Sequence, residues 1–218
     1  MEQAKLERIA EWSVGLEISG TAVKSAKEAR DIHVADSLAG LEIAAIQDAE
    51  SIIDIGSGAG FPGLVLAVAL PDAQITLVDS VRKKMEAAAS FAKELELGNV
   101  ECIWGRAEEI AAVGGPHREA YDVVTARALA QLGVLLEYSA PLLREDGHLV
   151  AWKGSPEPAE LAAAQASGEI LGFSPGELIA TKPFKRSRDR HFYVAQKKAP
   201  TDPRFPRRAG VALKRPLA

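Results

Sequence analysis

The chain has 218 residues, of which 47% are hydrophobic and 26% are charged, a length and composition that suit one globular domain with an extension. Its single cysteine, Cys102, excludes a disulfide framework, so we expect a buried, inert thiol and a reducing, cytoplasmic compartment. We find no apolar run approaching the roughly 20 residues of a membrane span and no signal-peptide core at the N-terminus.

The net charge of −4 hides an asymmetry along the chain. Residues 182–218 hold twelve basic residues and two acids, a net charge of +10, which leaves −14 for the remainder. An acidic body with a basic C-terminal part favours a polyanionic partner. A solvated basic tail without a partner is the alternative.

Residues 3–48 have the apolar spacing of helices and form an N-terminal helical extension. We expect one helix before the break at Ser19-Gly20-Thr21, a second over 24–31 and a third over 36–46. The third is expected to cover a sheet edge and to shape the mouth of a cleft.

A glycine-rich turn follows a short buried strand over residues 52–55 and precedes an apolar helix over 64–70. Strand, glycine loop and helix form the geometry of a nucleotide-type site. The glycines at 58, 60 and 63 fit the dinucleotide pattern G-x-G-x-x-G, while those at 56, 58 and 60 fit the G-x-G-x-G pattern of S-adenosylmethionine (SAM) enzymes. The loop alone leaves both cofactors open.

The second strand, over 74–79, ends in Asp79, which lies 21 residues after Gly58. That spacing suits an acid that accepts hydrogen bonds from a ribose diol. Ser80 is expected to cap a helix over 81–96. A third strand over 100–104 leads to Glu108, an acid placed to meet an adenine or its ribose.

The second half of the chain continues the alternation of strands and helices. Strands are expected over 121–126, 147–154, 178–181 and 191–196, the last two as an antiparallel pair, with helices over 129–143 and 157–167. The proline-rich segment 199–210 is expected to be extended. We therefore divide the chain into the extension (1–48), an α/β domain (49–198) and a basic tail (199–218).

This alternation indicates a parallel sheet with helices on both faces, whose ligands bind beyond the carboxyl ends of the strands. Five expected strand ends carry polar groups that would converge there: Asp54 to Gly60, Asp79, Arg106 to Glu108, Arg127 and Lys153. The convergence favours an active site.

Taken together, these motifs resemble the bacterial ribosomal RNA small-subunit methyltransferase G family, also called glucose-inhibited division protein B. The resemblance covers nearly the whole chain and rests on the order and spacing of eight short motifs. They are His33-Val34-Ala35-Asp36-Ser37-Leu38, Asp54 to Gly63, Val78-Asp79-Ser80 with Lys83-Lys84, Arg106-Ala107-Glu108, Ala126-Arg127-Ala128, Lys153-Gly154, Arg190-His191, and Phe205-Pro206-Arg207 with Lys214-Arg215-Pro216. One departure is visible: the family's Asn-Leu-Thr motif is replaced by Ile18-Ser19-Gly20-Thr21.

The resemblance implies a class I SAM-dependent methyltransferase fold, Rossmann-like, with a seven-stranded sheet. It implies methyl transfer from SAM to N7 of a guanine in the 530 loop of 16S ribosomal RNA, with S-adenosylhomocysteine as product. It places SAM at Gly56, Phe61, Ala107, Glu108 and Arg127, to which the glycine pattern adds Gly58 and the spacing adds Asp79. The implied protein is a monomer that acts on the 30S subunit or an assembly intermediate.

Guanine N7 carries an in-plane lone pair, so catalysis can be mostly positioning. We expect Arg127 and Lys153 to border the guanine, Arg190 to contact RNA, and the basic tail to follow the RNA backbone. Asp54 is expected to orient the glycine loop or the cofactor ammonium, and Phe61 to pack on the cofactor or line the guanine slot. The three tryptophans, Trp12, Trp104 and Trp152, are expected in the core or the cleft wall.

The four histidines and one cysteine lack ligand spacing, so no metal is expected. Two alternatives stay open: an NAD-dependent oxidoreductase and a non-catalytic RNA-binding module. Against the first, about 60 residues follow the fifth strand and no Tyr-x-x-x-Lys motif is present. The second would not need acids and an arginine at successive strand ends.

Overall fold

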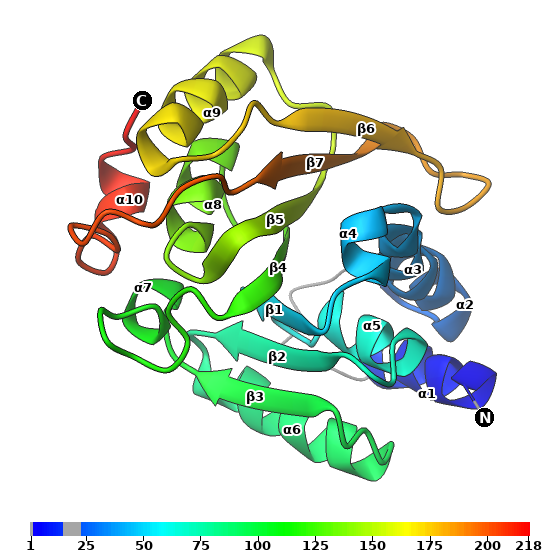
Figure 1. The fold of residues 1–218 in the computed structure, drawn as a ribbon. Coiled ribbons are helices and arrows are strands. Elements are labelled where there is room, and N and C mark those ends of the chain that lie inside the picture. The colour runs from blue at the N-terminus through cyan, green and yellow to red at the C-terminus, as the bar shows by residue number, and fades with distance from the viewer. Residues whose placement is uncertain (1, 15–22) are drawn as a thin grey trace. The chain divides into compact units, whose positions relative to one another are not determined.

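The computed structural model describes residues 2–14 and 23–218 of this α/β protein (Figure 1). Its seven strands follow the order β3-β2-β1-β4-β5-β7-β6 in one mixed sheet. The expected fold class is therefore confirmed. Contacts divide the chain into two compact units, the first made of Met1–Gly105 with Lys182–Arg188 and the second of Arg106–Thr181 with Asp189–Ala218.

The first unit contains three parallel strands, β1 (Ser51–Ile55), β2 (Gln74–Asp79) and β3 (Val100–Trp104). Ser51 pairs with Gln74 and Ile75 with Val100, so the three carboxyl ends lie at the same edge of the unit. Helices α5 (Gly63–Ala69) and α6 (Arg82–Glu94) connect them. All three strands and both helices match the expected elements within a few residues.

The N-terminal part of the first unit is helical, but its segments differ from the expected ones. They are α1 (Glu2–Val14), α2 (Ala26–Ala29), the π-helix η1 (Arg30–Ala35), α3 (Asp36–Leu38), the 3-10 helix η2 (Ala39–Glu42) and α4 (Ala44–Gln47). The boundary expected before Asp36 is wrong, because residues 26–38 hold neither glycine nor proline and stay helical through the π segment. The expected break at Ser19-Gly20-Thr21 and the departure at Ile18–Thr21 lie outside the described residues.

These N-terminal helices pack on the first unit's own helix layer, with α1 and α3 against α5. Trp12 of α1 stacks on Phe91 of α6 with ring centroids 4.3 Å apart. Asn99 closes the base of the layer: its buried side-chain amide donates to the carbonyls of Ala67, Leu70 and Ala73 at 3.0–3.1 Å. One amide thereby ends α5 and fixes the start of β3.

The expected cap at the start of α6 is wrong. The helix begins at Arg82, and its cap residue is Val81, whose side chain makes no capping hydrogen bond. The Val81 N–H donates instead to Asp79, the last residue of β2. A carboxylate from the preceding strand therefore takes the place that the sequence assigns to the Ser80 hydroxyl.

The second unit contains β4 (Tyr121–Arg127), β5 (Leu143–Lys153), β6 (Glu177–Thr181) and β7 (Arg190–Gln196). The first two are parallel, and β7 runs antiparallel to both β5 and β6, as expected for the last pair. The helices of this unit are α7 (Ala107–Ile110), α8 (Leu132–Ser139), α9 (Pro158–Leu171) and α10 (Val211–Lys214).

Strand β5 starts four residues earlier than expected, because Glu145-Asp146-Gly147 resembles a turn in the sequence. In the structure, the register between β4 and β5 shifts at this point. A Cβ at Gly147 would lie 2.9–3.0 Å from three carbonyl oxygens, so only glycine fits the irregular pairing.

Within residues 2–14 and 23–218, no helix is long and apolar enough to cross a membrane. Cys102 is half-buried rather than fully buried, and it is a free thiol. Burial, together with the charge of Glu101, raises its pKa to about 11. The thiol is therefore protonated at neutral pH, in keeping with the expected inert cysteine.

Candidate active site

The glycine loop leaves β1 in a conformation that L-residues rarely adopt. Gly56, Gly58 and Gly60 have φ of 66°, 56° and 88°. Ser57 fastens the loop at its centre: its N–H donates to the carbonyl of Val78, and its own carbonyl accepts from Gly60 and Phe61. Three left-handed glycines in five residues explain why this stretch must be glycine-rich.

The glycines of this loop serve different purposes. A Cβ on Gly60 would lie 2.4 Å from the Leu64 side chain, and one on Gly63 would lie 2.1 Å from the Leu77 side chain, so both are needed for close packing. A Cβ on Gly58 would meet the Gly56 carbonyl at 3.9 Å and the Lys84 ammonium at 4.0 Å, which are ordinary contacts. Gly58 is therefore not required for close packing, and a methyl-sized space lies beside its backbone.

We expect Gly63→Ala to destabilise the protein, because the added methyl overlaps Leu77 and crowds the Asp54 carboxylate at 3.0 Å. Overpacking of this kind costs about 1–3 kcal/mol of unfolding free energy, which urea titration can measure. Gly98→Ala is the matched control, since a Cβ there has no atom within 4 Å. Equal stability of the two variants would contradict the packing role of Gly63.

Asp54 is fully buried at the end of β1, and its Oδ2 accepts the N–H of Gly63, the first residue of α5, at 2.9 Å. The carboxylate thus fixes the loop to the helix start, one of the two roles that the sequence left open. It also brings negative charge to the helix terminus. A dinucleotide's pyrophosphate would need that terminus, so the Asp54 contact counts against the NAD alternative.

Asp79 binds the glycine loop directly. Its Oδ2 accepts the N–H of Gly58 at 2.9 Å, its Oδ1 accepts that of Val81 at 2.8 Å, and the residue is buried. The expected convergence of Gly58 and Asp79 is therefore present. Each carboxylate oxygen has two lone pairs, so acceptor capacity is left for a ligand hydroxyl.

Phe61 is buried and stacks on His33 of η1, with ring centroids 4.7 Å apart and the planes 25° from parallel. The ring thus ties the loop to the N-terminal helices. Sequence reasoning assigned Phe61 to a ligand and missed this protein contact, because nothing in the local pattern relates residue 61 to residue 33.

Trp104, the last residue of β3, is a second feature that the sequence did not reveal. The residue is 58% exposed, which excludes the core and leaves the cleft wall, the other of its two expected positions. Its Nε1 donates to the Ser80 carbonyl, and the Arg82 guanidinium lies 5.4 Å from the ring centroid. By contrast, Trp152 is buried and meets Phe192 edge-on.

In the second unit, Ala107 and Glu108 form the first turn of α7. Glu108 is buried, and its Oε1 accepts the N–H of Gly210 at 2.8 Å. Nearby, burial and the charges of Glu108 and Glu137 raise the pKa of Tyr138 to about 12. Glu108 is thus held in place by the C-terminal segment, a long-range contact that spacing could not reveal.

The C-terminal segment is folded onto its unit rather than free. Arg207 makes a two-pronged pair with the buried Glu137, with Nε–Oε1 and Nη2–Oε2 distances of 2.6 and 2.5 Å. Arg118 donates to the carbonyls of Phe205 and Thr201, and Phe205 is buried. Residues 199–210 form no helix, as expected, and a short helix follows at α10.

The three remaining site residues lie at one end of the second unit's strands. Arg127 ends β4 opposite Trp152, Lys153 ends β5 opposite His191, and Arg190 begins β7. After Arg127, Ala128 has a φ of 54°, a strained conformation of the kind that clusters at functional sites. The Lys153 ammonium pairs with Glu160 at 2.7 Å, and the same Glu160 oxygen accepts the Leu132 N–H at 2.9 Å.

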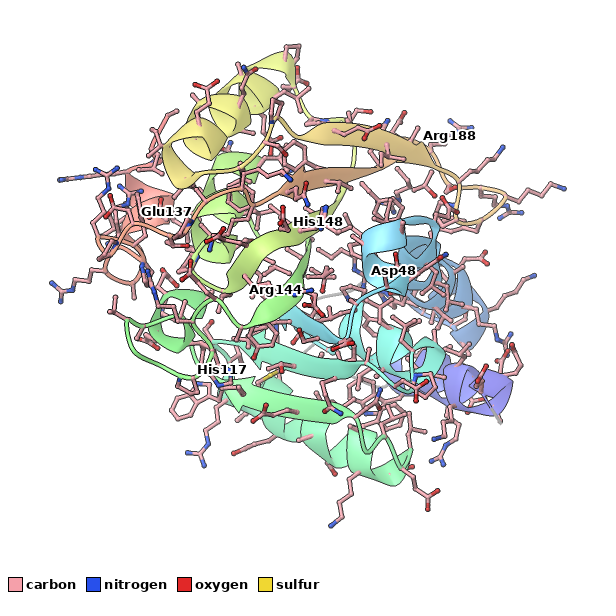
Figure 2. All side chains as sticks on the ribbon, in the orientation of Figure 1. Asp48, His117, Glu137, Arg144, His148 and Arg188 are labelled. Atoms are coloured by element: carbon pink, nitrogen blue, oxygen red, sulfur yellow. The ribbon has the colours of Figure 1, made fainter. Side chains whose placement is uncertain are left out.

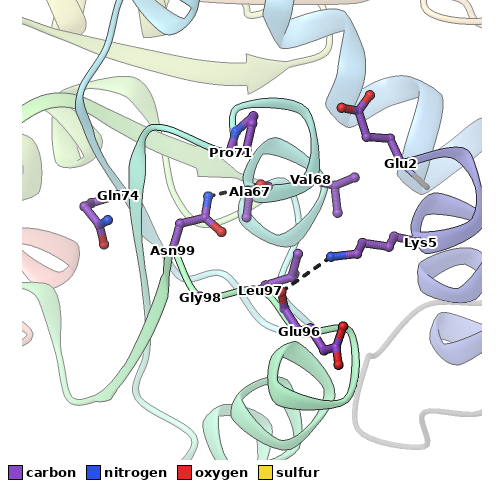
Figure 3. A pocket seen from close by; sticks show the side chains of 10 residues that line it. All are labelled: Glu2, Lys5, Ala67, Val68, Pro71, Gln74, Glu96, Leu97, Gly98 and Asn99. Atoms are coloured by element: carbon purple, nitrogen blue, oxygen red, sulfur yellow. Dashed lines mark hydrogen bonds between the residues drawn. The ribbon is translucent and has the colours of Figure 1, made fainter.

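A cavity of about 500 Å³ lies at the opposite ends of the first unit's strands (Figure 3). It is lined in part by Gln74, which begins β2, and Asn99, which precedes β3; at its rim the Lys5 ammonium lies 3.4 Å from the Glu96 carbonyl. It is remote along the strands from Asp79 and the glycine loop. Among residues 2–14 and 23–218, no group of three or more side chains could hold a metal ion.

Comparison with known proteins places this chain in a family. A family profile described as GidB, rRNA small subunit methyltransferase G, matches residues 4–192. The Ribosomal RNA small subunit methyltransferase G of Desulfitobacterium hafniense is 35% identical over 212 residues, covering 97% of this chain and 86% of that protein. The protein of the same name from Moorella thermoacetica is 38% identical over 197 residues, covering 90% and 82%.

The fold also matches solved structures. The S-adenosylmethionine-dependent methyltransferase SibL, in its apo form, aligns with a TM-score of 0.61 at 12% identity, covering 75% of this chain and 55% of that one. At that identity the likeness concerns the fold. The profile and the relatives carry the family assignment: this chain belongs to the rRNA small subunit methyltransferase G family.

Proposed function

We propose that this protein transfers a methyl group from SAM to N7 of a guanine in the 530 loop of 16S ribosomal RNA. The observation that carries the proposal is the loop after β1, whose left-handed Gly58 has a methyl-sized space beside its backbone and is braced by Asp79. Such a loop, in a chain of a small-subunit rRNA methyltransferase family, supports a SAM site.

The residues present fit that cofactor. Gly56 and Gly58 would let the methionine part approach the backbone, and Phe61 holds the loop against His33. The lone pairs of Asp79 that Gly58 and Val81 do not use would accept the ribose hydroxyls. Ala107 and Glu108 would face the adenine, and Arg127 would complete the set. When bound, SAM supplies a methyl group activated by its sulfonium charge.

The chain itself would act by positioning. Guanine presents N7 and O6 as acceptors, and N7 needs no general base because its lone pair is already available. Lys153 and Arg127 would hold O6 while N7 is kept about 3 Å from the methyl carbon. Arg190 would contact the RNA at the same strand end. No residue needs to take a proton from N7, and no metal ion is needed to activate this nucleophile.

Lys153 carries a particular constraint, since its ammonium already pairs with Glu160. The pair fixes the direction of the lysine side chain and leaves two of its three donors for other partners. We infer that Glu160 orients Lys153 and, through the Leu132 N–H, ties it to the start of α8.

The test is methyl transfer with defined substrates. Purified protein is incubated with SAM carrying a labelled methyl group and with 30S subunits, naked 16S RNA or 23S RNA, and the modified base is mapped by cleavage at 7-methylguanosine. We expect label in 16S RNA alone, at one guanine of the 530 loop, and at least a hundredfold loss of rate in Arg127→Ala. Label at another base or in 23S RNA, or binding of NADH in place of SAM, would overturn the proposal.

Comparing naked RNA with 30S subunits shows which state of the RNA is the substrate. We expect a 30S particle or an assembly intermediate, acted on by a monomer in the cytoplasm, where ribosomes assemble. Sedimentation of the protein with and without SAM measures the oligomeric state.

A further inference from the structure

The basic residues at the C-terminal end of the chain differ in whether an acid of the protein already pairs with them. Four of the cations from Lys197 onward are paired with acids: Lys197 with Glu119, Lys198 with Asp146, Arg204 with Asp202 and Arg207 with Glu137. Two of these four, Arg204 and Arg207, lie in the tail itself, and the Arg207 pair with the buried Glu137 serves the fold. Only Arg208, Lys214 and Arg215 lack an acid within 4 Å there, among the residues described, and they are spread over eight positions.

The loop between β6 and β7 is different. Within seven residues it carries Lys182, Lys185, Arg186 and Arg188, all exposed, and none has an acid within 4 Å in the described structure. Arg188 is labelled in Figure 2. Asp189 is the single acid between Lys182 and Arg190, so the loop is the densest unneutralised positive charge of the C-terminal segment.

The loop is also shaped. The Ser187 N–H donates to the Phe184 carbonyl at 2.9 Å, and the Ser187 hydroxyl donates to the same oxygen at 2.7 Å. These bonds close a turn whose two central residues are Lys185 and Arg186. Both cations are consequently held at the tip of a defined hairpin connection, which lowers the entropy lost when they bind.

We propose that this loop, Lys182–Arg188, is the main phosphate-binding surface of the protein and grips the RNA backbone. The inference rests on the proposed RNA substrate. It assigns most of the RNA-backbone contact to this loop, in addition to the contact expected from the tail. Arginine and lysine at a turn tip suit successive phosphates, whose contacts release counterions and give affinity without base specificity. The turn contains one aromatic residue, Phe184, so stacking is not its main means of recognition.

The experiment compares two triple variants that lose the same charge. The loop variant is Lys185→Ala with Arg186→Ala and Arg188→Ala. The control is Arg8→Ala with Lys198→Ala and Arg204→Ala, three exposed cations whose charges are paired with Glu94, Asp146 and Asp202. Binding to a 16S RNA transcript is measured by filter retention at several salt concentrations, and SAM binding by calorimetry.

For the loop variant we expect the affinity for RNA to be about a hundredfold weaker at 0.1 M salt. The slope of the logarithm of the binding constant against the logarithm of the salt concentration should be smaller in magnitude by about two to three, which is roughly 0.7–0.9 for each lost phosphate contact. SAM affinity should stay unchanged in both variants, and the control should keep the wild-type slope within about one half. The single variant Arg186→Ala, expected to lower the slope by about one, repeats the test should the triple variant fold poorly.

A loop variant with the wild-type slope overturns the proposal, as does a control that loses as much. Failure of the loop proposal is distinguishable from failure of the proposed function. In the first case the wild-type protein still methylates 16S RNA and the loop variant does so with unchanged affinity; in the second the wild-type protein methylates none.

Discussion

Asp79→Ala is expected to weaken cofactor binding strongly, raising the Kd for SAM by about 10²–10³-fold. The carboxylate accepts the N–H groups of Gly58 and Val81 at 2.9 and 2.8 Å, and a hydrogen bond to a charged group contributes about 1.5–3 kcal/mol. Its loss releases the left-handed Gly58 and removes the acceptors proposed for the ribose. Calorimetric titration with SAM and with S-adenosylhomocysteine measures the change.

Asp79→Asn separates the two roles of this side chain. The amide keeps one acceptor oxygen and loses the charge, so we expect the loop to be partly restored and the Kd to fall between those of wild type and Asp79→Ala. Asp72→Ala serves as the control, since Asp72 is exposed and makes no hydrogen bond in the described structure. A Kd within threefold of wild type for Asp79→Ala would rule out this account of the loop.

Arg207→Ala is expected to lower the free energy of unfolding by about 3 kcal/mol, because it leaves the Glu137 carboxylate buried without its partner. The Glu137 side chain is 3% exposed and that of Arg207 is 25% exposed, so the pair is largely shielded from water. In a chain of this size the expected fall in Tm is about 6–12 °C. Differential scanning calorimetry measures it.

Two further variants make the Arg207 result interpretable. Arg204→Ala removes a surface pair in which the Arg204 side chain is 64% exposed and that of Asp202 is 50% exposed. The substitution should lower the free energy of unfolding by less than about 1 kcal/mol. Adding Glu137→Gln to Arg207→Ala should recover part of the lost stability, since no charge is then left buried. If the double variant were as unstable as Arg207→Ala, the cost would come from lost packing and not from the carboxylate.

Short-range pattern was enough to locate most elements. The strands at 51–55, 74–79 and 100–104 lie where apolar, β-branched residues predict them, and the antiparallel pair β6 and β7 lies where it is expected. Two boundaries failed because a group other than the expected one decides them. The start of α6 depends on Asp79 and not on Ser80, and the start of β5 depends on a register shift against β4.

In the candidate site, too, some contacts could be predicted from the sequence and others could not. Gly58 and Asp79 could be paired from their separation, because consecutive parallel strands bring their carboxyl ends together. The protein contacts of Phe61, Glu108 and Lys153 could not be predicted in this way. Their partners are His33, Gly210 and Glu160 respectively, and no local pattern in the sequence marks these as partners. Each of these three residues was assigned to a ligand, and each proves also to have a partner within the protein.

The sequence by itself therefore determined the fold class, the glycine loop and the family, because these depend on residue type and on spacing along the chain. The tertiary structure alone decided which positive charges are free to bind a partner. An arginine in the tail and one in the β6–β7 loop look alike in sequence, but Arg207 is neutralised by Glu137 and Arg186 has no acid within 4 Å in the described structure. Whether a cation is available depends on the acid that folding brings beside it.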